Sequence, residues 1–327
     1  MGYQCLWTEE IYSLEISSLS ITDLIFKSFA SDFNPPIYYI FAHISLILTS
    51  GLDFSIRYPS VITGILLIPV MYWLGATYKD EATGIYCAGL TTILLPFIYY
   101  AQFGRAYSMS LLFFALALVY YIKVKNENTR TDRILFWALA VINVWIHLFA
   151  AIPIGLMCVD LLLDRKHWLC GIGAGICSLP LLGMLVNVLS TRTHQAFNYG
   201  ASIIQMVVLT PMEFFNTIFL NIFVLAGVGA WYDKNPIKKN LIVITVITLI
   251  VGVVGSCYTP FFPRYYMTVS LIILLMCSAG IVELTKTCSK KIGKNLDYII
   301  LIILFVVFIW MEFPNLVSHY TIMQYEC

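Results

Sequence analysis

Two adjacent carboxylates, Glu9 and Glu10, stand near the front of the chain in the stretch CLWTEEIYSL. A further candidate carboxylate, Asp32, follows in DFNPPIYYI, two positions before Asn34 and a Pro-Pro turn. A carboxylate placed beside a hydroxyl group can remove its proton as a general base. Each residue also has a plain structural reading. Glu9 and Glu10 could be solvated loop charges, and Asp32 could cap a helix that begins at the prolines.

Cationic and polar side chains recur at the edges of later apolar runs. YYAQFGRAYS contains Gln102, Arg105 and Tyr107, WIHLF contains His147, and FFPRYY contains Arg264 and Tyr265. Two arginines can hold a phosphate group through charge-assisted hydrogen bonds. The alternatives are an Arg105 that snorkels to lipid headgroups, an Arg264 that anchors an aromatic belt, and a structural His147. Arg57 and His43 are interpreted as membrane-interface residues.

The composition limits which scaffold can position these groups. The chain has 327 residues, of which 60% are hydrophobic and 11% charged, against about 25% charged in soluble proteins. The net charge is +1 and there is no basic patch with interleaved aromatic residues, so we exclude nucleic acid as a partner. The nine cysteines form no CxxC pair and are interpreted as small buried apolar residues. We therefore predict an all-α polytopic membrane protein with a single domain over residues 1–327.

Apolar runs predict about ten transmembrane helices. They cover 57–76, 83–101, 105–122, 133–147, 148–163, 168–189, 213–231, 240–258, 265–284 and 297–313. The run 133–163 is split near His147, because one helix of that length would overshoot a bilayer about 30 Å thick. A short tail, 314–327, follows the last span.

The basic residues predict the orientation. Alternate loops hold 14 of the 19 lysines and arginines: Lys79, Lys123, Lys125, Arg130, Arg133, Arg165, Lys166, Lys234, Lys238, Lys239, Lys286, Lys290, Lys291 and Lys294. By the positive-inside rule these loops are cytoplasmic. Residues 1–56 and the loop 190–212 then face the exterior, together with every candidate site residue. The apolar stretch 36–50 is too short to span and is expected to lie along the outer leaflet.

This set of groups suits one kind of chemistry. A phosphate that carries an apolar tail, held at the bilayer surface, is a polyprenyl phosphate. Transfer of a sugar from it requires a base beside the acceptor hydroxyl and cations beside the departing phosphate.

Five motifs, in order along the chain, resemble the membrane glycosyltransferases with the C-type fold, which include protein O-mannosyltransferases and aminoarabinose transferases. WTEEIYSL and DFNPPIYYI resemble the first external loop of that family, with an aromatic residue before Asp-Glu and then Asp-x-His-Pro-Pro-Leu-Tyr-Tyr. IRYPSVITG is similar to its Arg-Leu-Pro-Ser span, YYAQFGRAYS to its Ser-Gln-x-x-Arg-x-Tyr turn, and FFPRYYMTV to its late Arg-Tyr span. The match covers about residues 6–122 and returns at 259–275.

The resemblance implies a polyprenyl-phosphate-sugar donor, an external active site, juxtamembrane helices within 1–56 and an inverting transfer. The catalytic Asp of the family falls on Glu9, the following Glu on Glu10, the second Asp on Asp32 and its His on Asn34. Arg105 and Arg264, with His147, Tyr107 and Tyr265, are the expected donor-phosphate residues, and Asn34 and Gln102 the acceptor or positioning residues. Phe103 stands where many relatives have Glu, so we expect no metal requirement and predict no metal site or certain cofactor.

Two departures leave alternatives open. The usual first transmembrane helix of the family has no counterpart here and is expected to be missing, and Glu9 is one methylene longer than Asp. We predict a hexosyl- or pentosyltransferase of a prokaryotic or archaeal plasma membrane, with a glycan, lipid or protein acceptor. The alternatives are a transporter or flippase of lipid-linked sugars, for which internal repeats would be expected, and an inactive relative.

Overall fold

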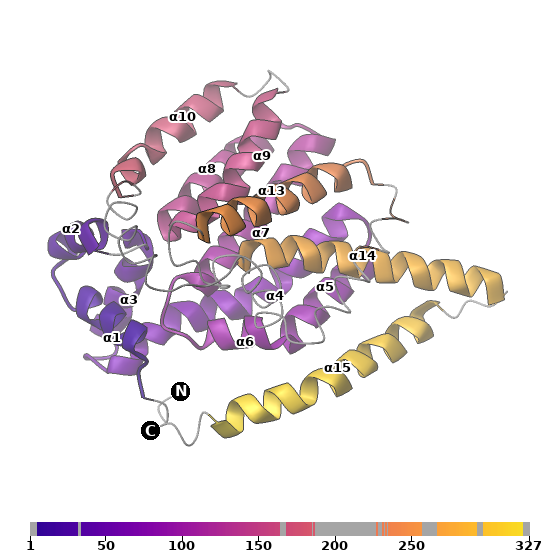
Figure 1. Cartoon of the computed structure of the whole chain (residues 1–327), viewed down its shortest axis with the longest axis horizontal. Coiled ribbons are helices and arrows are strands. Elements are labelled where there is room, and N and C mark those ends of the chain that lie inside the picture. Colours follow the sequence, from indigo (N-terminus) through magenta and orange to yellow (C-terminus); the bar gives the residue numbers. More distant parts are fainter. Residues whose placement is uncertain are drawn as a thin grey trace.

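The computed structural model describes residues 5–31, 34–163, 168–184, 186, 227, 231, 233, 235–256, 267–292 and 297–322, and these ranges contain helices and turns but no strand. The bounds of the helices are α1 Thr8–Ser17, α2 Ile21–Ser31, α3 Pro36–Leu48, η1 Asp53–Arg57, α4 Tyr58–Tyr78, α5 Glu81–Ile93, α6 Leu95–Ala101, α7 Tyr107–Asn126, α8 Arg130–Ile146, η2 Leu148–Ala150, α9 Ala151–Leu163, α10 Trp168–Ser178, α13 Lys238–Ser256, α14 Met267–Ile292 and α15 Asp297–Ile322. Figure 1 shows α4–α9, α13 and α14 grouped together, with α1, α2 and α3 at one end of the group and α15 along one edge.

The chain is an integral membrane protein built from apolar helices. In the part of the chain that the structure describes, four stretches are long and apolar enough to cross a membrane: Asp53–Tyr78, Tyr107–Asn126, Met267–Lys290 and Asp297–Tyr320. The α5–α6 pair adds a fifth if it is counted as one span. The total of ten spans stays a prediction, and the predicted span 213–231 lies almost wholly outside the described residues.

The predicted division near His147 is confirmed. Helix α8 ends at Ile146, and His147 has an extended backbone, with φ −148° and ψ 118°, before η2 begins. The single span predicted over 83–101 is wrong in its continuity, because α5 and α6 are separate helices bent by 63°. Pro96 explains the break, since it has no N–H to donate and its ring clashes with a helix continuing through it.

Helices α7 and α14 form the centre of the core. Fourteen residues of α7 are buried, and the run Thr268–Val282 of α14 is buried without interruption. A helix that is apolar all round and buried in this way needs neighbours on every side. Helix α15 is the opposite case: most of its apolar residues are exposed, and it lies along the outer edge of the bundle (Figure 1).

Two glycines bring α4 and α5 into backbone contact. A Cβ added to Gly75 would lie 2.7 Å from the Cα of Gly84, and one added to Gly84 would lie 2.5 Å from the carbonyl oxygen of Tyr72. Small residues allow this approach, which membrane helices use in place of a hydrophobic driving force.

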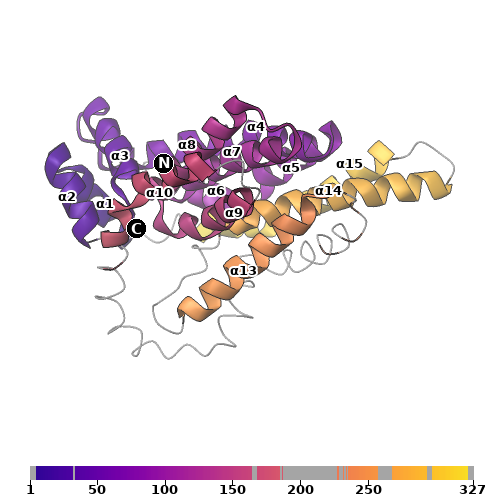
Figure 2. The same cartoon turned by 90° about the horizontal axis from the view of Figure 1, so that it is seen from above.

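The N-terminal helices and the lysines of the predicted cytoplasmic loops lie at opposite ends of the bundle. Helices α1, α2 and α3 cover the end where α4 begins and α5 ends, as Figure 2 shows. The other end carries Lys79, Lys123, Lys125 and Lys286 from the loops predicted to be cytoplasmic. Which end faces the exterior stays a prediction.

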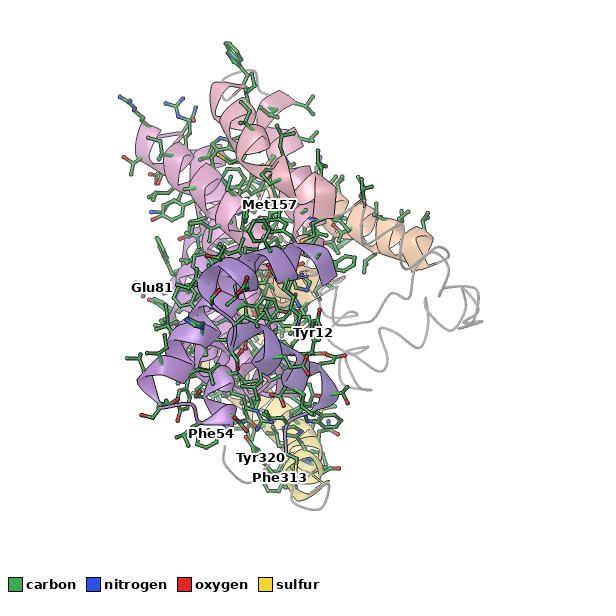
Figure 3. All side chains as sticks on the ribbon, turned by 90° about the vertical axis from the view of Figure 1, so that its left-hand side faces the viewer. Tyr12, Phe54, Glu81, Met157, Phe313 and Tyr320 are labelled. Carbon is green, nitrogen blue, oxygen red and sulfur yellow. The ribbon has the colours of Figure 1, made fainter. Side chains whose placement is uncertain are left out.

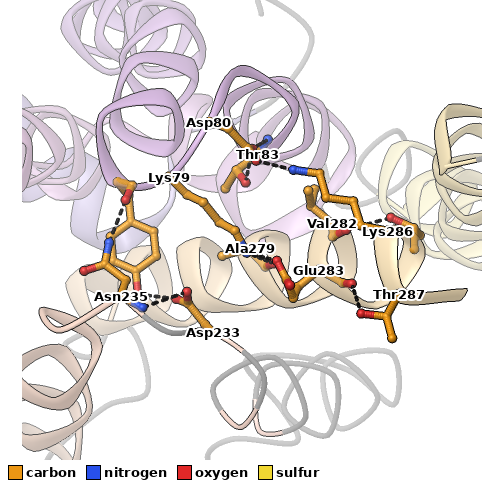
Figure 4. A network of polar contacts seen from close by, with 12 residues as sticks. Lys79, Asp80, Thr83, Asp233, Asn235, Ala279, Val282, Glu283, Lys286 and Thr287 are labelled. Atoms are coloured by element: carbon orange, nitrogen blue, oxygen red, sulfur yellow. Dashed lines mark hydrogen bonds and ion pairs between the residues drawn. The ribbon is translucent and has the colours of Figure 1, made fainter. Parts of the chain in front are cut away.

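Ion pairs join α4, α5 and α14 at the basic end (Figure 4). Lys79 pairs with Glu283 at 2.9 Å, and Asp80 pairs with Lys286 at 2.5 Å. Asp80 also caps α5 by accepting from the backbone N–H of Thr83 at 2.9 Å. Burial raises the pKa of Asp80, but the hydrogen bonds from Lys286 and Thr83 outweigh this effect and hold the pKa below its ordinary value.

Replacing Asp80 tests the two roles of this carboxylate separately. We expect Asp80→Ala to lower the free energy of unfolding by about 1–2 kcal/mol, through loss of the cap and of a part-exposed ion pair. Asp80→Asn keeps a capping oxygen and should cost about half as much. Because the pKa of Asp80 is lowered in the folded protein, its contribution is present at neutral pH and is lost as the pH falls through that lowered value. Thermal unfolding of the wild type and Asp80→Ala in detergent, at neutral and acidic pH, measures this contribution. The difference in melting temperature between the two proteins should shrink in acid, and a difference that grows would contradict the assignment.

Candidate active site at the covered end of the bundle

The N-terminal segment folds into short helices for local reasons. Helix α3 begins at Pro36, directly after Pro35, as the Pro-Pro turn predicted. His43 is half-buried and its Nδ1 lies 2.7 Å from the carbonyl oxygen of Ser17, which ties α3 to the end of α1. Figure 3 looks directly at these helices, with Tyr12 of α1 facing the viewer.

The carboxylate of Glu10 joins three segments of the chain. It is fully buried, and both of its oxygens bind Arg57, at 2.7 Å from Nε and 2.6 Å from Nη2. The backbone N–H of Gly104 donates to Oε1 at 2.7 Å, and that of Trp7 donates to Oε2 at 3.0 Å. A carboxylate offers about four acceptor positions, and these four donors fill them. Glu10 is thus committed to holding α1 against η1 and the turn after α6.

The turn between α6 and α7 is tightly packed around Gly104. An added Cβ would lie 3.0 Å from the side chain of Ile56 and 3.1 Å from Oε1 of Glu10. The missing side chain lets the backbone N–H reach the carboxylate directly. The carbonyl oxygen of the next residue, Arg105, accepts from Oγ of Ser60 at 3.0 Å, which fixes the turn to α4.

The side chain of Arg105 points under the N-terminal helices. It is 7% exposed, and its Nη1 donates to the hydroxyl groups of Ser13 at 3.2 Å and Tyr39 at 3.1 Å. Ser13 in turn donates to the carbonyl oxygen of Glu9. These two hydroxyl acceptors help to orient the guanidinium. Glu9 is half-buried on the first turn of α1, one residue from the filled carboxylate of Glu10.

A row of aromatic rings continues from the turn into the bundle. Phe103 stacks on Tyr99 and Tyr107, with ring centroids 5.7 and 6.4 Å apart, and the ring of Tyr107 lies 5.3 Å from that of His147. Phe103, Tyr107 and His147 are all buried. At the position where many members of the family that the sequence resembles have Glu, this chain therefore has a buried aromatic ring, Phe103.

The structure brings together some of the predicted site residues. Glu9, Glu10 and Arg105 share the covered end, and Tyr107 and His147 adjoin it. Asn34 is buried just before the Pro-Pro turn, whereas Gln102 faces α15, where its Nε2 donates to the hydroxyl of Tyr320 at 2.9 Å. Asp32, Arg264 and Tyr265 lie outside the described residues, as does the loop 190–212. Within the described ranges no three His, Cys, Asp or Glu side chains are grouped to hold a metal ion.

The interpretation of Arg57 as a membrane-interface residue was wrong. Its side chain is 2% exposed, and it binds Glu10 and the carbonyl oxygen of Cys5. The partner that explains it lies 47 positions earlier, so local spacing gives no sign of the pair. The usable signal was its place in IRYPS, the motif similar to Arg-Leu-Pro-Ser.

Removing one partner of this buried pair should be costly. We expect Glu10→Ala or Arg57→Ala to lower the free energy of unfolding by about 3–5 kcal/mol, because each leaves an uncompensated buried group. The double variant should cost less than the sum of the single variants. Reversible unfolding in detergent measures this cycle, and single costs below about 1 kcal/mol, as at exposed pairs, would contradict the assignment.

Two glycines should respond to the same change with opposite signs. Gly104→Ala places a methyl group against Ile56 and Glu10 and should destabilise the protein by about 1–3 kcal/mol. Gly155→Ala is the matched control, since nothing lies within 4 Å of the added Cβ in helix α9. It should stabilise by about 0.5–1 kcal/mol. Equal shifts in melting temperature for the two variants would sink the argument.

The comparisons with known proteins concern the fold. No family model matches the chain, and no curated protein matches it by sequence. A crystal structure of ArnT from Cupriavidus metallidurans bound to undecaprenyl phosphate matches 85% of this chain, with a TM-score of 0.63 and 14% identity. The structure of the same protein in the apo state matches 89%, with a TM-score of 0.61 and 15% identity. The chain spans 56% and 58% of the lengths of those ArnT chains. Over the matched part, this chain has the C-type glycosyltransferase fold.

Proposed function

We propose that this protein transfers a sugar from a polyprenyl-phosphate donor to an acceptor hydroxyl. The observation that carries the proposal is the Glu10–Arg57–Gly104 junction, which fixes a second carboxylate, Glu9, and a buried arginine, Arg105, at one end of the bundle. The likeness to an ArnT structure bound to undecaprenyl phosphate supports a donor of this class.

Glu9 is the general base in this proposal. Glu10 is a poor base, because taking a proton would require it to give up one of four hydrogen bonds in a buried site. Glu10 is therefore assigned to positioning α1, and through it Glu9. Asp32, two positions before Asn34 in the sequence, is kept as the residue that positions the acceptor or substitutes as base.

Arg105 holds the donor phosphate in this proposal. Its Nη1 is oriented by Ser13 and Tyr39, so its position is set before a ligand arrives. A preorganised cation stabilises negative charge that develops on a leaving phosphate. Arg264 and Tyr265 are assigned to the same task, with Tyr107 and His147 as further contacts behind the turn. Gln102 is assigned to holding the turn, since it binds Tyr320.

The proposed transfer moves one proton and one sugar and changes no oxidation state. Glu9 takes the proton of the acceptor hydroxyl, and the acceptor oxygen attacks the anomeric carbon of the sugar. The bond between that carbon and the phosphate oxygen breaks, and the electron pair leaves with the polyprenyl phosphate. Attack opposite the leaving group inverts the anomeric centre. The site is proposed to face the exterior of a plasma membrane, with a glycan, lipid or protein as acceptor.

A donor panel with paired glutamine variants tests the proposal. The purified protein in lipid nanodiscs is incubated with radiolabelled polyprenyl-phosphate sugars and host membrane extract, and release of free polyprenyl phosphate is measured. We expect Glu9→Gln to lower kcat by at least about 100-fold with a small change in KM, because a general base acts in the transition state. Glu15→Gln, on the exposed face of the same helix, is the matched control and should leave turnover unchanged.

Two results would count against the enzyme. Full turnover by Glu9→Gln would remove Glu9 from the reaction. A wild-type protein that turns over no donor, yet binds one more weakly after Arg105→Lys, would indicate a carrier of lipid-linked sugars or an inactive relative.

A further inference from the structure

A buried carboxylate stands in the middle of the outermost helix. Glu312 of α15 is 4% exposed, although its neighbours Trp310 and Phe313 are 76% and 61% exposed. Ionisable groups within membrane-spanning helices are costly and are usually kept for a specific purpose. Packing alone does not explain Glu312, since an apolar residue of similar size would fill the same space without that cost.

The partners of Glu312 are a backbone group and one side chain. Its Oε1 accepts from the backbone N–H of Leu95 at 2.9 Å, and its Oε2 accepts from Nδ2 of Asn315 at 3.1 Å. Leu95 is the first residue of α6, directly after the 63° bend. Helix α5 closes with Leu94 donating to Leu90, so the N–H of Leu95 has left the helical ladder. When a helix is broken inside the membrane, the backbone N–H that is freed at the break requires a partner from a neighbouring helix.

Helix α15 follows α6 beyond this first contact. The rings of Tyr99 and His319 lie 5.6 Å apart, and Gln102, just past the end of α6, donates to Tyr320. Figure 3 shows Phe313 and Tyr320 along the edge of the covered end. Two residues after Gln102 stands Gly104, which donates to Glu10. The short helix is thus held by α15 at its start and just past its end, immediately before the turn that completes the candidate site.

We propose that Glu312 is a positioning residue for the candidate active site. By binding the N–H of Leu95 it fixes the bend between α5 and α6. The bend sets where the turn delivers the N–H of Gly104 and the side chain of Arg105. The positioning itself is a property of the fold, and its effect on catalysis rests on the proposed transferase function.

Hydrogen exchange of the full-length protein in nanodiscs tests the positioning without assuming any activity. Glu312→Leu removes the acceptor but keeps an apolar side chain of similar size, and Glu312→Gln keeps an acceptor oxygen. We expect exchange of the amides in 95–104 to rise at least about tenfold in the leucine variant, as expected for loss of one charge-assisted bond. The glutamine variant should stay within about threefold of wild type. Trp310→Leu, on the exposed face of α15, is the matched control and should change nothing in 95–104.

The activity arm separates this inference from the proposed function. With a donor that the wild type uses, the leucine variant should raise KM for the donor and lower kcat, and the glutamine variant should restore most of both. If the wild type turns over no donor, the transferase proposal fails while the exchange result still decides the role of Glu312.

Two exchange results would contradict the proposed role of Glu312. Exchange that rises evenly along α14 and α15, with no excess in 95–104, would show that Glu312 only docks the helix and would overturn the proposal. If the leucine variant does not fold, Glu312→Asp replaces it, since the shorter side chain draws the carboxylate back from the N–H of Leu95 by one methylene. It should then speed exchange of the amides in 95–104, and unchanged exchange there would also overturn the proposal.

Discussion

The N-terminal segment depends on the buried carboxylate of Glu10 for its place on the bundle. Four donors converge on it: the guanidinium of Arg57 twice, the N–H of Gly104 and the N–H of Trp7. They come from η1, from the turn after α6 and from the start of α1 itself. A carboxylate bound in this way acts as a joint between segments far apart in the sequence. Because its oxygens already accept four hydrogen bonds, the proposed function assigns the role of base to the neighbouring Glu9 and not to Glu10.

Different interactions hold the helices together at each end of the bundle. At the basic end, Lys79, Asp80, Glu283 and Lys286 form part-exposed ion pairs that tie helix ends together. At the covered end the joints are buried and use backbone groups as donors. Buried joints lose more when one partner is missing, because the remaining partner cannot turn to water. Of these two ends, the covered end is therefore the one at which the loss of a single partner should cost more.

Sequence reasoning reached the helical class, the division at His147 and the helix at Pro36 because proline, helix length and apolar runs are local signals. It also expected Glu9, Glu10 and Arg105 to lie near one another, as they do at the covered end, whereas their roles stay predictions. It did not predict the buried pair of Arg57, because the partner, Glu10, is remote in the sequence. It also predicted one continuous span across Pro96, because the residues on both sides of this proline are apolar. The number of spans, the outer position of 36–50 and the roles of Asp32 and Arg264 stay predictions.

The contact between Gly75 and Gly84 bears on how the protein is made. The two helices touch through their own backbones within one hairpin, so their contact at this point requires no residue from the later helices. In a bilayer such a hairpin can associate as soon as α5 has left the ribosome and entered the lipid. It then offers α7, synthesised next, a finished surface on which to pack. Larger residues at Gly75 or Gly84 would delay this step, before α7 and the turn that carries Gly104 and Arg105 are in place.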